Sequence, residues 1–171
     1  MNNERKWFVI QTRPRNEKKV FEQIILKDVE VYLPRLQSVR IWSDRKKKID
    51  VPLFPGYVFV HASEEERVNA ISNTHGAIRY IMYLKRPAVV SELEIRNIQI
   101  SLQVPDKVKI EDSTINIGDF VEITHGPFNG LTGYISQIRG NYKLMVSITE
   151  LNTTFSVELS SSDVTLLKKL G

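Results

Sequence analysis

A glycine-rich stretch in the last third of this 171-residue chain constrains its fold more than any other feature. Apolar and polar residues alternate over 120–123, and a second β-type run follows at 134–138. The glycines of the intervening turn permit positive φ angles and a close approach of backbones that a Cβ atom would hinder. These glycines are Gly126, Gly130 and Gly133. The segment therefore predicts a strand, a tight loop and a second strand.

The same stretch carries a longer motif, G-D-x-V-x-I-x-x-G-P-F-x-G-x-x-G. This motif resembles the KOW motif of small SH3-like barrels, which occur in NusG-type transcription factors and in some ribosomal proteins. The resemblance implies a module that binds protein or RNA and has no chemistry of its own. The positions that match the motif are Gly118, Asp119, Gly126, Pro127, Phe128, Gly130 and Gly133.

A length of 171 residues suits one large or two small domains. Because 42% of the residues are hydrophobic, a packed fold is expected. The chain has no cysteine, which excludes disulfides and thiolate metal sites and fits a reducing compartment. The N-terminal residues lack the apolar segment of a signal peptide, and no run approaches the roughly 18 apolar residues of a membrane span. We therefore expect a soluble cytoplasmic protein without membrane contact.

Charge is distributed unevenly along the chain. Residues 1–101 contain 18 Lys or Arg and 12 Asp or Glu, whereas residues 102–171 contain 6 and 8. The first part has a balance of +6 and the second a balance of −2. This asymmetry indicates that the first part contacts phosphates, and the alternative is a basic surface that is merely solvated.

The first hundred residues alternate between strand and helix patterns. Strands are expected at 7–12, 29–33, 36–42, 48–53, 57–60 and 78–84. Helices are expected from Arg15 to Asp28, from a capping box at Ser63–Glu66 to about Asn73, and after a second capping box at Ser91. This order predicts a ferredoxin-like α/β sandwich with an extra hairpin that has a basic tip.

The remaining residues predict a linker followed by a small β-barrel. Residues 104–116 lack clear periodicity and contain a proline, as linkers do. The later runs are rich in β-branched and aromatic residues, and their glycines disfavour a helix by about 1 kcal/mol each. The fold class is therefore α+β, with an all-β C-terminal domain of five strands. These strands are expected at 119–124, 133–138, 142–148, 154–158 and 163–167.

Taken together, both halves resemble the NusG family of transcription elongation factors. The N-terminal half is similar to the NGN domain at 6–12, 53–60 and 87–91. Residues 12–15 and the charged hairpin look closer to the specialised RfaH and UpxY types, which act on selected operons, than to housekeeping NusG. The resemblance implies an NGN-like RNA polymerase-binding domain at 5–103, a linker at 104–116 and a KOW β-barrel domain at 117–169.

In this family the NGN domain binds the tip of the clamp helices on the largest RNA polymerase subunit through an aromatic depression. The strand pattern supports such a surface, because Tyr57 and Phe59 lie on one face and Val58 and Val60 on the other. If the valines face the core, the aromatic pair faces outward, as is typical of interfaces; the alternative is that either ring is a core residue. The matching positions are Phe54, Tyr57, Phe59, Tyr80, Tyr83, Ile95 and Ile98.

Basic residues gather where the first helix is expected to begin, and a helix N-terminus itself favours anions. The resemblance implies that this edge faces upstream DNA and the displaced non-template strand. The sequence departs from RfaH at His75, where RfaH has an arginine, and each cation has the alternative of a solvated side chain. The expected nucleic-acid-binding positions are Arg13, Arg15, Lys18, Lys19, Thr74 and His75.

The sequence contains no catalytic constellation. His61, His75 and His125 fall on different expected elements, with no Asp or Glu at a metal-ligand spacing. The glycine-rich turn has no lysine, so it does not match a phosphate-binding loop. We therefore expect no enzyme activity, no metal and no cofactor.

The leading hypothesis is a monomeric, non-enzymatic elongation and antitermination factor that suppresses pausing or termination. As the resemblance implies, it binds the clamp helices and the non-template or upstream DNA, and its KOW domain recruits a small-subunit ribosomal protein or Rho. We expect an operon-selective paralogue; the alternatives are a housekeeping NusG and an RNA-binding or ribosome-associated KOW protein. RfaH parks its C-terminal domain as helices over the clamp site, whereas the local sequence here favours strands.

Overall fold

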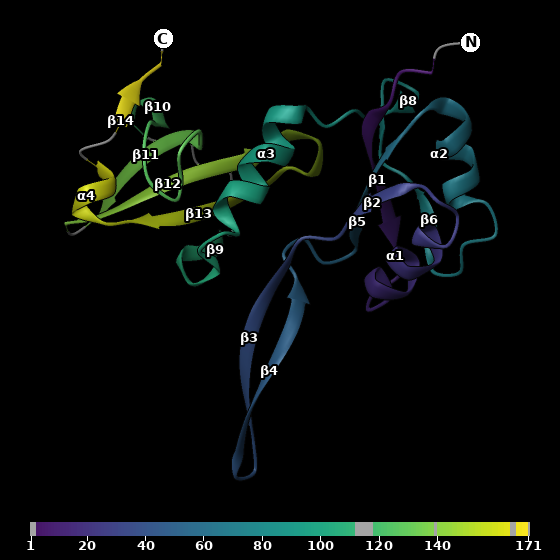
Figure 1. Cartoon of the computed structure of the whole chain (residues 1–171), viewed down its shortest axis with the longest axis horizontal. Helices are drawn as coiled ribbons and strands as arrows, with labels where there is room; N and C mark the ends of the chain where they lie inside the picture. Colours follow the sequence, from purple (N-terminus) through teal and green to yellow (C-terminus); the bar gives the residue numbers. More distant parts are fainter. Residues whose placement is uncertain (1–2, 112–117, 139, 165–166, 171) are drawn as a thin grey trace. The chain divides into compact units, whose positions relative to one another are not determined.

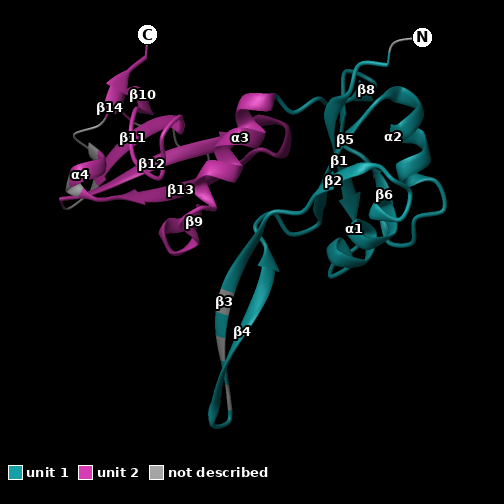
Figure 2. Cartoon of the chain, in the orientation of Figure 1, with its two compact units in different colours: residues 1–91 teal, residues 92–171 magenta. Residues whose placement is uncertain are grey.

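The structure, a computed structural model, describes residues 3–111, 118–138, 140–164 and 167–170 (Figure 1). The chain divides into two compact units, residues 1–91 and residues 92–171 (Figure 2). Among the described residues, no helix has the length and apolar character that a bilayer-spanning segment requires.

Unit 1 combines an antiparallel sheet, two helices and two separate hairpins. Its helices are α1 (Glu17–Ile25) and α2 (Glu64–Ile71). Its strands are β1 (Lys6–Thr12), β2 (Glu30–Tyr32), β3 (Arg35–Trp42), β4 (Arg45–Pro52), β5 (Tyr57–Ala62), β6 (Ala77–Tyr80), β7 (Met82–Tyr83) and β8 (Arg86–Pro87).

The central sheet of unit 1 has the strand order β2-β5-β1-β6, and each neighbouring pair is antiparallel. Each helix connects two strands that have one other strand between them, which is the split β-α-β arrangement of a ferredoxin-like sandwich. The expected sandwich is therefore confirmed. Strands β3 and β4 pair only with each other and form the expected extra hairpin.

Both helices of unit 1 cover the same face of this sheet. Val20 and Ile24 of α1 and Ala70 of α2 pack with Val58 and Val60 in one buried cluster. The valines of β5 therefore face the helices, as the alternation along this strand predicts. The N-terminus of α2 also matches the sequence, because Ser63 and Glu66 form the expected capping box.

Unit 2 consists of one helix packed with a six-stranded antiparallel sheet, plus short helical turns. The sheet order is β14-β10-β11-β12-β13-β9. Its strands are β9 (Val108–Glu111), β10 (Phe120–Ile123), β11 (Thr132–Ile138), β12 (Asn141–Ile148), β13 (Thr153–Leu159) and β14 (Leu167–Lys169). The helical elements are α3 (Glu92–Ser101), η1 (Pro105–Lys107), η2 (Thr149–Leu151) and α4 (Ser161–Val164). The expected β domain is confirmed, with β12 and β13 extended rather than helical.

Two parts of unit 2 differ from the sequence expectation. The described part of the expected linker is not irregular, because η1 is followed by β9, which pairs with β13 from Val108↔Val157 to Glu111↔Thr154. The expected strand at 163–167 begins instead as the turn α4, and β14 starts at Leu167. The side chain of Asp163 accepts a bond from the Ser160 backbone N–H at 2.8 Å, which favours a helical start there. Residues 112–116 of the expected linker lie outside the described residues.

The third helix is grouped with the β strands that follow it in the chain. Helix α3 lies within the predicted NGN-like range 5–103, but it groups with the β domain. Asn97 of α3 is buried, and its side chain donates to Thr132 Oγ1 at 3.1 Å and accepts from the Thr132 backbone N–H at 3.2 Å. A buried amide that is hydrogen-bonded in this way fixes the helix against the start of β11.

Candidate functional site

The face of the unit 1 sheet opposite α1 and α2 carries a row of aromatic rings. Trp7 stacks on His61 with ring centroids 4.8 Å apart, and it meets Tyr32 edge-on at 6.4 Å. Phe59 lies 6.4 Å from Tyr32 and 5.8 Å from Phe54. Strand register produces this row, because Trp7 pairs with His61 in the β1–β5 ladder and Tyr32 with Phe59 in the β2–β5 ladder.

The members of this row differ in exposure. Phe59 is completely buried and Phe54 nearly so, whereas Tyr57 is half-buried. Tyr32 is half-buried too, and burial raises the pKa of its phenol to about 12. The expected outward pair therefore splits, with Tyr57 accessible and Phe59 enclosed among rings.

Tyr80 lies on the other face of the sheet. It belongs to the buried cluster beneath the helices, where its ring is 6.0 Å from that of Phe8. Its hydroxyl donates to the Arg67 carbonyl at 2.5 Å, and burial raises its pKa well above the usual range. This ring is a core side chain, so its position does not suit the aromatic surface that the sequence predicts.

The other expected polymerase-binding positions belong to other elements. Tyr83 is 69% exposed in the short β7–β8 hairpin, between the exposed side chains Met82 and Leu84. Ile95 and Ile98 are buried in α3, which belongs to unit 2. Within unit 1 the structure therefore brings Phe54 and Phe59 into ring contact, with Tyr57 on the same face of β5 as Phe59.

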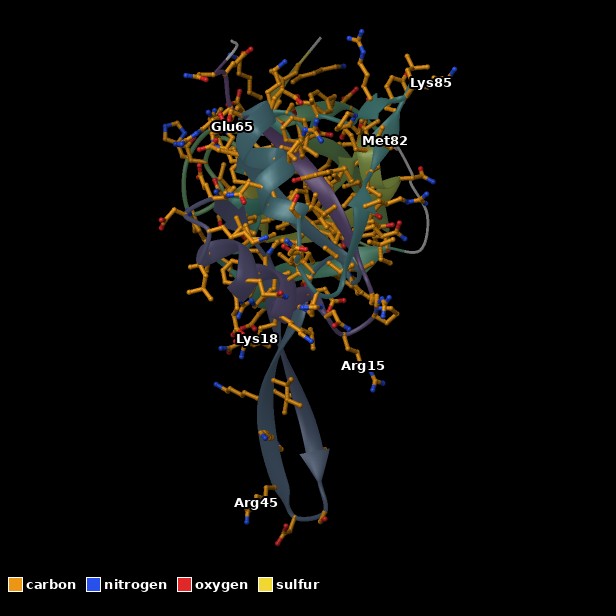
Figure 3. All side chains as sticks on the ribbon, turned by 90° about the vertical axis from the view of Figure 1, so that its right-hand side faces the viewer. Arg15, Lys18, Arg45, Glu65, Met82 and Lys85 are labelled. Carbon is orange, nitrogen blue, oxygen red and sulfur yellow. The ribbon has the colours of Figure 1, made fainter. Side chains whose placement is uncertain are left out.

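A basic hollow of about 1110 Å³ lies where the β3–β4 hairpin joins the rest of unit 1. It combines two residues of the expected nucleic-acid set, Arg15 and Lys18, with Arg35, Lys47 and Lys48 of the hairpin. Figure 3 shows Arg15 and Lys18 near the base of this hairpin, and Arg45 near its tip. The hairpin cations are not among the nucleic-acid-binding positions that the sequence predicts, although four of them are consecutive at 45–48.

A buried carboxylate shapes the floor of the hollow. Glu17 is 6% exposed, and its Oε1 accepts a bond from the Gly56 N–H at 2.8 Å. The Gly56 carbonyl in turn accepts from the Thr12 N–H at 2.8 Å. Gly56 has φ +87°, which a residue with a Cβ rarely adopts. The acid at the start of α1 is therefore engaged with the protein, while the neighbouring cations are exposed.

The remaining expected nucleic-acid positions fall into two groups. Arg13, Lys19 and His75 are exposed. The His75 backbone is held by the Gln23 side chain, which donates to its carbonyl at 2.8 Å and accepts from its N–H at 2.9 Å. Thr74, in contrast, is buried; its hydroxyl donates to the Ala70 carbonyl at 2.6 Å. The Thr74 side chain therefore shapes its loop rather than facing a ligand.

The glycines of the KOW-like motif in unit 2 are required by the backbone conformation and by close approaches of neighbouring strands. Gly118 has φ +71°, and a Cβ there would lie 2.4 Å from the Ile135 carbonyl oxygen. A Cβ at Gly133 would lie 2.5 Å from the Met145 carbonyl oxygen. The other motif residues complete the turn: Gly126 and Gly130 have positive φ, Phe128 is buried, Pro127 is exposed and Asp119 pairs with Lys169 at 3.1 Å.

The described residues contain no group of three or more His, Asp or Glu arranged to hold a metal ion. One His–carboxylate pair is not predicted by the sequence: His61 Nδ1 lies 2.6 Å from Glu30 Oε2 across the β2–β5 ladder. Its imidazole is stacked on Trp7, so the pair is part of the aromatic face.

An antiparallel split β-α-β unit followed by a β unit built on a glycine motif defines a two-part chain of the NGN–KOW class. A family model described as "Transcription termination factor nusG" matches residues 5–99. The chain belongs to the NusG family.

Relatives extend the likeness over nearly the whole chain. The transcription termination/antitermination protein NusG of Streptococcus pyogenes serotype M3 is 30% identical over 168 residues, covering 90% of this chain and 92% of that protein. The protein of the same name from Rickettsia typhi is 23% identical over 174 residues, covering 95% and 91%. A solved structure described as "Domain interaction in Thermotoga maritima NusG" is 26% identical, covers 98% of each chain and has a TM-score of 0.55.

Proposed function

We propose that this chain is an elongation and antitermination factor that binds the clamp helices of RNA polymerase through unit 1. The observation that carries the proposal is the aromatic row on the sheet face opposite α1 and α2. Rigid aromatic side chains are enriched at the centres of protein interfaces. Family membership supports this choice of partner, because the relatives are named as transcription termination/antitermination proteins.

Within this surface the roles of the residues differ. Tyr57 is half-buried and Tyr83 mostly exposed, so these two rings are the proposed direct contacts. Phe54 and Phe59 are enclosed and hold the row in place. Ile95 and Ile98 belong to the set that the family resemblance implies, but they are buried in α3 of unit 2 and are not among the contacts proposed for unit 1.

The nucleic-acid contact of the proposal is the exposed cation group of Arg13, Arg15, Lys18 and Lys19, together with His75. These residues face the upstream DNA or the displaced non-template strand in the proposed complex. Unit 2 recruits a second protein, such as a small-subunit ribosomal protein or Rho. The basic hairpin supports an operon-selective role, which occupancy mapping along the genome would test.

The binding of the full chain to core RNA polymerase tests the proposal. The double variant Tyr57→Ala/Tyr83→Ala should bind about 30-fold more weakly, or ~2 kcal/mol, and should lose its effect on pause lifetime in single-round transcription. Tyr142→Ala, in β12 of unit 2, is the matched control and should retain both. Unchanged polymerase affinity in the double variant contradicts the proposal. Tight RNA binding without polymerase would instead favour an RNA-binding KOW protein.

A further inference from the structure

Helix α3 and the sheet of unit 2 enclose a hollow of about 390 Å³. The hydrogen bonds between Asn97 and Thr132 hold the helix against the sheet at the start of β11. The lining residues come from α3, β10, β11 and β12, and also from the turn η2 and the start of β13. Small-molecule sites have volumes of roughly 300–1,000 Å³, so this hollow has the size of a site for a small ligand.

Two aromatic rings form part of the lining. Phe120 and Tyr134 are paired in the β10–β11 ladder, and their ring centroids lie 5.0 Å apart. Both side chains are half-buried. Tyr134 lies on the same strand face as Thr132, because alternate residues of a strand share a face. The rings therefore lie beside the contact that attaches α3, where their faces can attract a cation.

The α3 side of the hollow supplies a carboxylate. Glu94 lies in the first turn of α3 and lines the hollow, and its side chain is half-buried. Its Oε1 accepts a bond from the Thr149 backbone N–H at 3.2 Å. A carboxylate can accept about four hydrogen bonds, so an N–H donor of a ligand can join the bond from Thr149.

A second carboxyl group lies near Glu94. Glu150, in η2, is half-buried, and its Oε2 is enclosed without a hydrogen-bond partner among the described residues. Burial and the negative charge of Glu94 raise the pKa of the Glu150 carboxyl. Two neighbouring carboxylates repel each other, and a cation beside them relieves the repulsion. This side of the hollow therefore favours a positively charged ligand.

The charge of unit 2 as a whole agrees with this preference. Residues 92–171 contain 7 Lys or Arg and 10 Asp or Glu, a balance of −3, whereas residues 1–91 contain 17 and 10, a balance of +7. The described residues that line the hollow include no Lys, Arg or His. A calcium ion takes six to eight oxygen ligands, whereas aromatic faces suit an organic ammonium group. The chemistry of the lining therefore favours an organic cation.

We propose that the hollow between α3 and the sheet of unit 2 binds an organic cation, with its ammonium group on Glu94 and its aliphatic chain against Phe120 and Tyr134. The second carboxyl group, Glu150, favours a ligand with two positive charges. A short aliphatic diamine and a lysine side chain of a protein share the ammonium chemistry, and the test separates these two sources. This site is additional to the polymerase surface proposed for unit 1 and does not depend on it.

Titration of the ¹⁵N-labelled full chain with 1,4-diaminobutane, followed by NMR at constant ionic strength, tests this site. The amide signals of Thr132, Tyr134 and Thr149 should shift and saturate. Glu94→Gln keeps an acceptor for the Thr149 N–H but removes the charge, so it should weaken binding at least about tenfold. The matched control Glu158→Gln removes the same charge from an exposed position of β13 outside the lining, and it should change the affinity less than about twofold.

The rings and the ligand are tested separately. Tyr134→Leu should bind the diamine about threefold to tenfold more weakly, whereas Tyr134→Phe keeps the ring and should bind as the wild type does. Glu150→Gln leaves the Glu94–Thr149 bond in place and should weaken the diamine more than it weakens N-acetyl-lysine methylamide. Tighter binding of the diamine assigns the site to a free cation, and tighter binding of the lysine amide assigns it to a protein side chain.

Three outcomes would overturn the assignment. The first is an equal loss of affinity in Glu94→Gln and Glu158→Gln, which would reduce the effect to net charge. The second is the same set of shifts with 1,4-butanediol, which has the length of the diamine but no charge. The third is the absence of shifts around the hollow with either cation at about 10 mM. Equal thermal melts of the two glutamate variants separate lost binding from lost folding, and retained polymerase binding in Glu94→Gln separates this site from the proposed function.

Discussion

Lys27, just beyond the end of α1, donates from Nζ to Oγ1 of Thr74 at 2.7 Å and so joins the first helix to the loop after the second. The same ammonium donates to the carbonyls of Asn69, at 3.0 Å, and of Ser72. Helix α2 has no basic residue in its own last turn. A cation from another element therefore satisfies the carbonyls at its C-terminus and opposes the negative end of its dipole.

Replacing this lysine should destabilise unit 1. Lys27→Met keeps the aliphatic stem but leaves those carbonyls without their donor, so we expect a loss of about 1–2 kcal/mol, seen as a melting temperature lower by about 3–6 °C. Lys19→Met, at an exposed position of α1, is the control and should melt with the wild type. Identical melts for both variants would show that water replaces the lysine at no cost.

Tyr80→Phe should separate stability from partner binding. The substitution removes the hydroxyl that donates to the Arg67 carbonyl, and it should cost about 1 kcal/mol of unfolding free energy. Polymerase binding should be unchanged, because the ring lies in the core beneath the helices. Tyr57→Phe provides the comparison on the opposite face. A Tyr80→Phe variant with full stability and weakened polymerase binding would contradict this assignment.

The glycines of unit 2 should differ sharply in their tolerance of alanine. Gly118→Ala places a Cβ against the Ile135 carbonyl at a positive φ, so we expect a loss of about 3 kcal/mol. Gly140 also has a positive φ, +79°, but a Cβ added there would meet no heavy atom of the described residues within 4 Å. Gly140→Ala should therefore lower the free energy of unfolding by only about 1 kcal/mol, the cost of placing alanine at a positive φ. Chemical denaturation of both variants measures the difference, and equal losses would refute the steric argument.

Stability should fall in acid partly through Glu66. The Arg5 guanidinium, which reaches Glu66 Oε1 at 2.6 Å, and the Ser63 backbone N–H hold the pKa of this carboxyl below its usual range. A lowered native pKa means that the stabilisation is complete above the ordinary value of about 4.3 and is lost as the pH falls through the native value. Urea denaturation from neutral pH down to about pH 3 should show a weaker acid dependence for Glu66→Gln than for Glu65→Gln, its exposed neighbour. Parallel pH profiles of the two variants would show that the Arg5–Glu66 pair does not contribute to the loss of stability in acid.

Local signals predicted much of this fold because each depends on neighbouring residues. The capping box at Ser63 needs a partner three residues later, and the turn glycines need only the backbone conformation at their own positions. The β9 strand was missed because its alternation lasts only four residues, Val108–Glu111, and its pairing with β13 is not a local property. The pairing of α3 with unit 2 depends equally on a distant partner, Thr132.

The candidate site was harder to predict, since a surface is a property of the whole sheet. Tyr80 and Tyr83 are three residues apart, so a continuous strand would place them on opposite faces; this parity was a usable signal. The β6 strand in fact ends at Tyr80, and its register with β1 shifts between Gln11 and Thr12. The stacking of His61 on Trp7 and its contact with Glu30 join residues far apart in the chain, which no short motif encodes.

Because β3 and β4 pair only with each other, the length of this hairpin can change without altering the register of the other strands. Inserting or deleting two residues in each strand would move the tip by about 7 Å while keeping every side chain on its original face. The closure between Pro34 and Leu53 leaves the core strands untouched by such changes. A change in the reach of the hairpin would therefore leave the pairing of the four-stranded core sheet as it is.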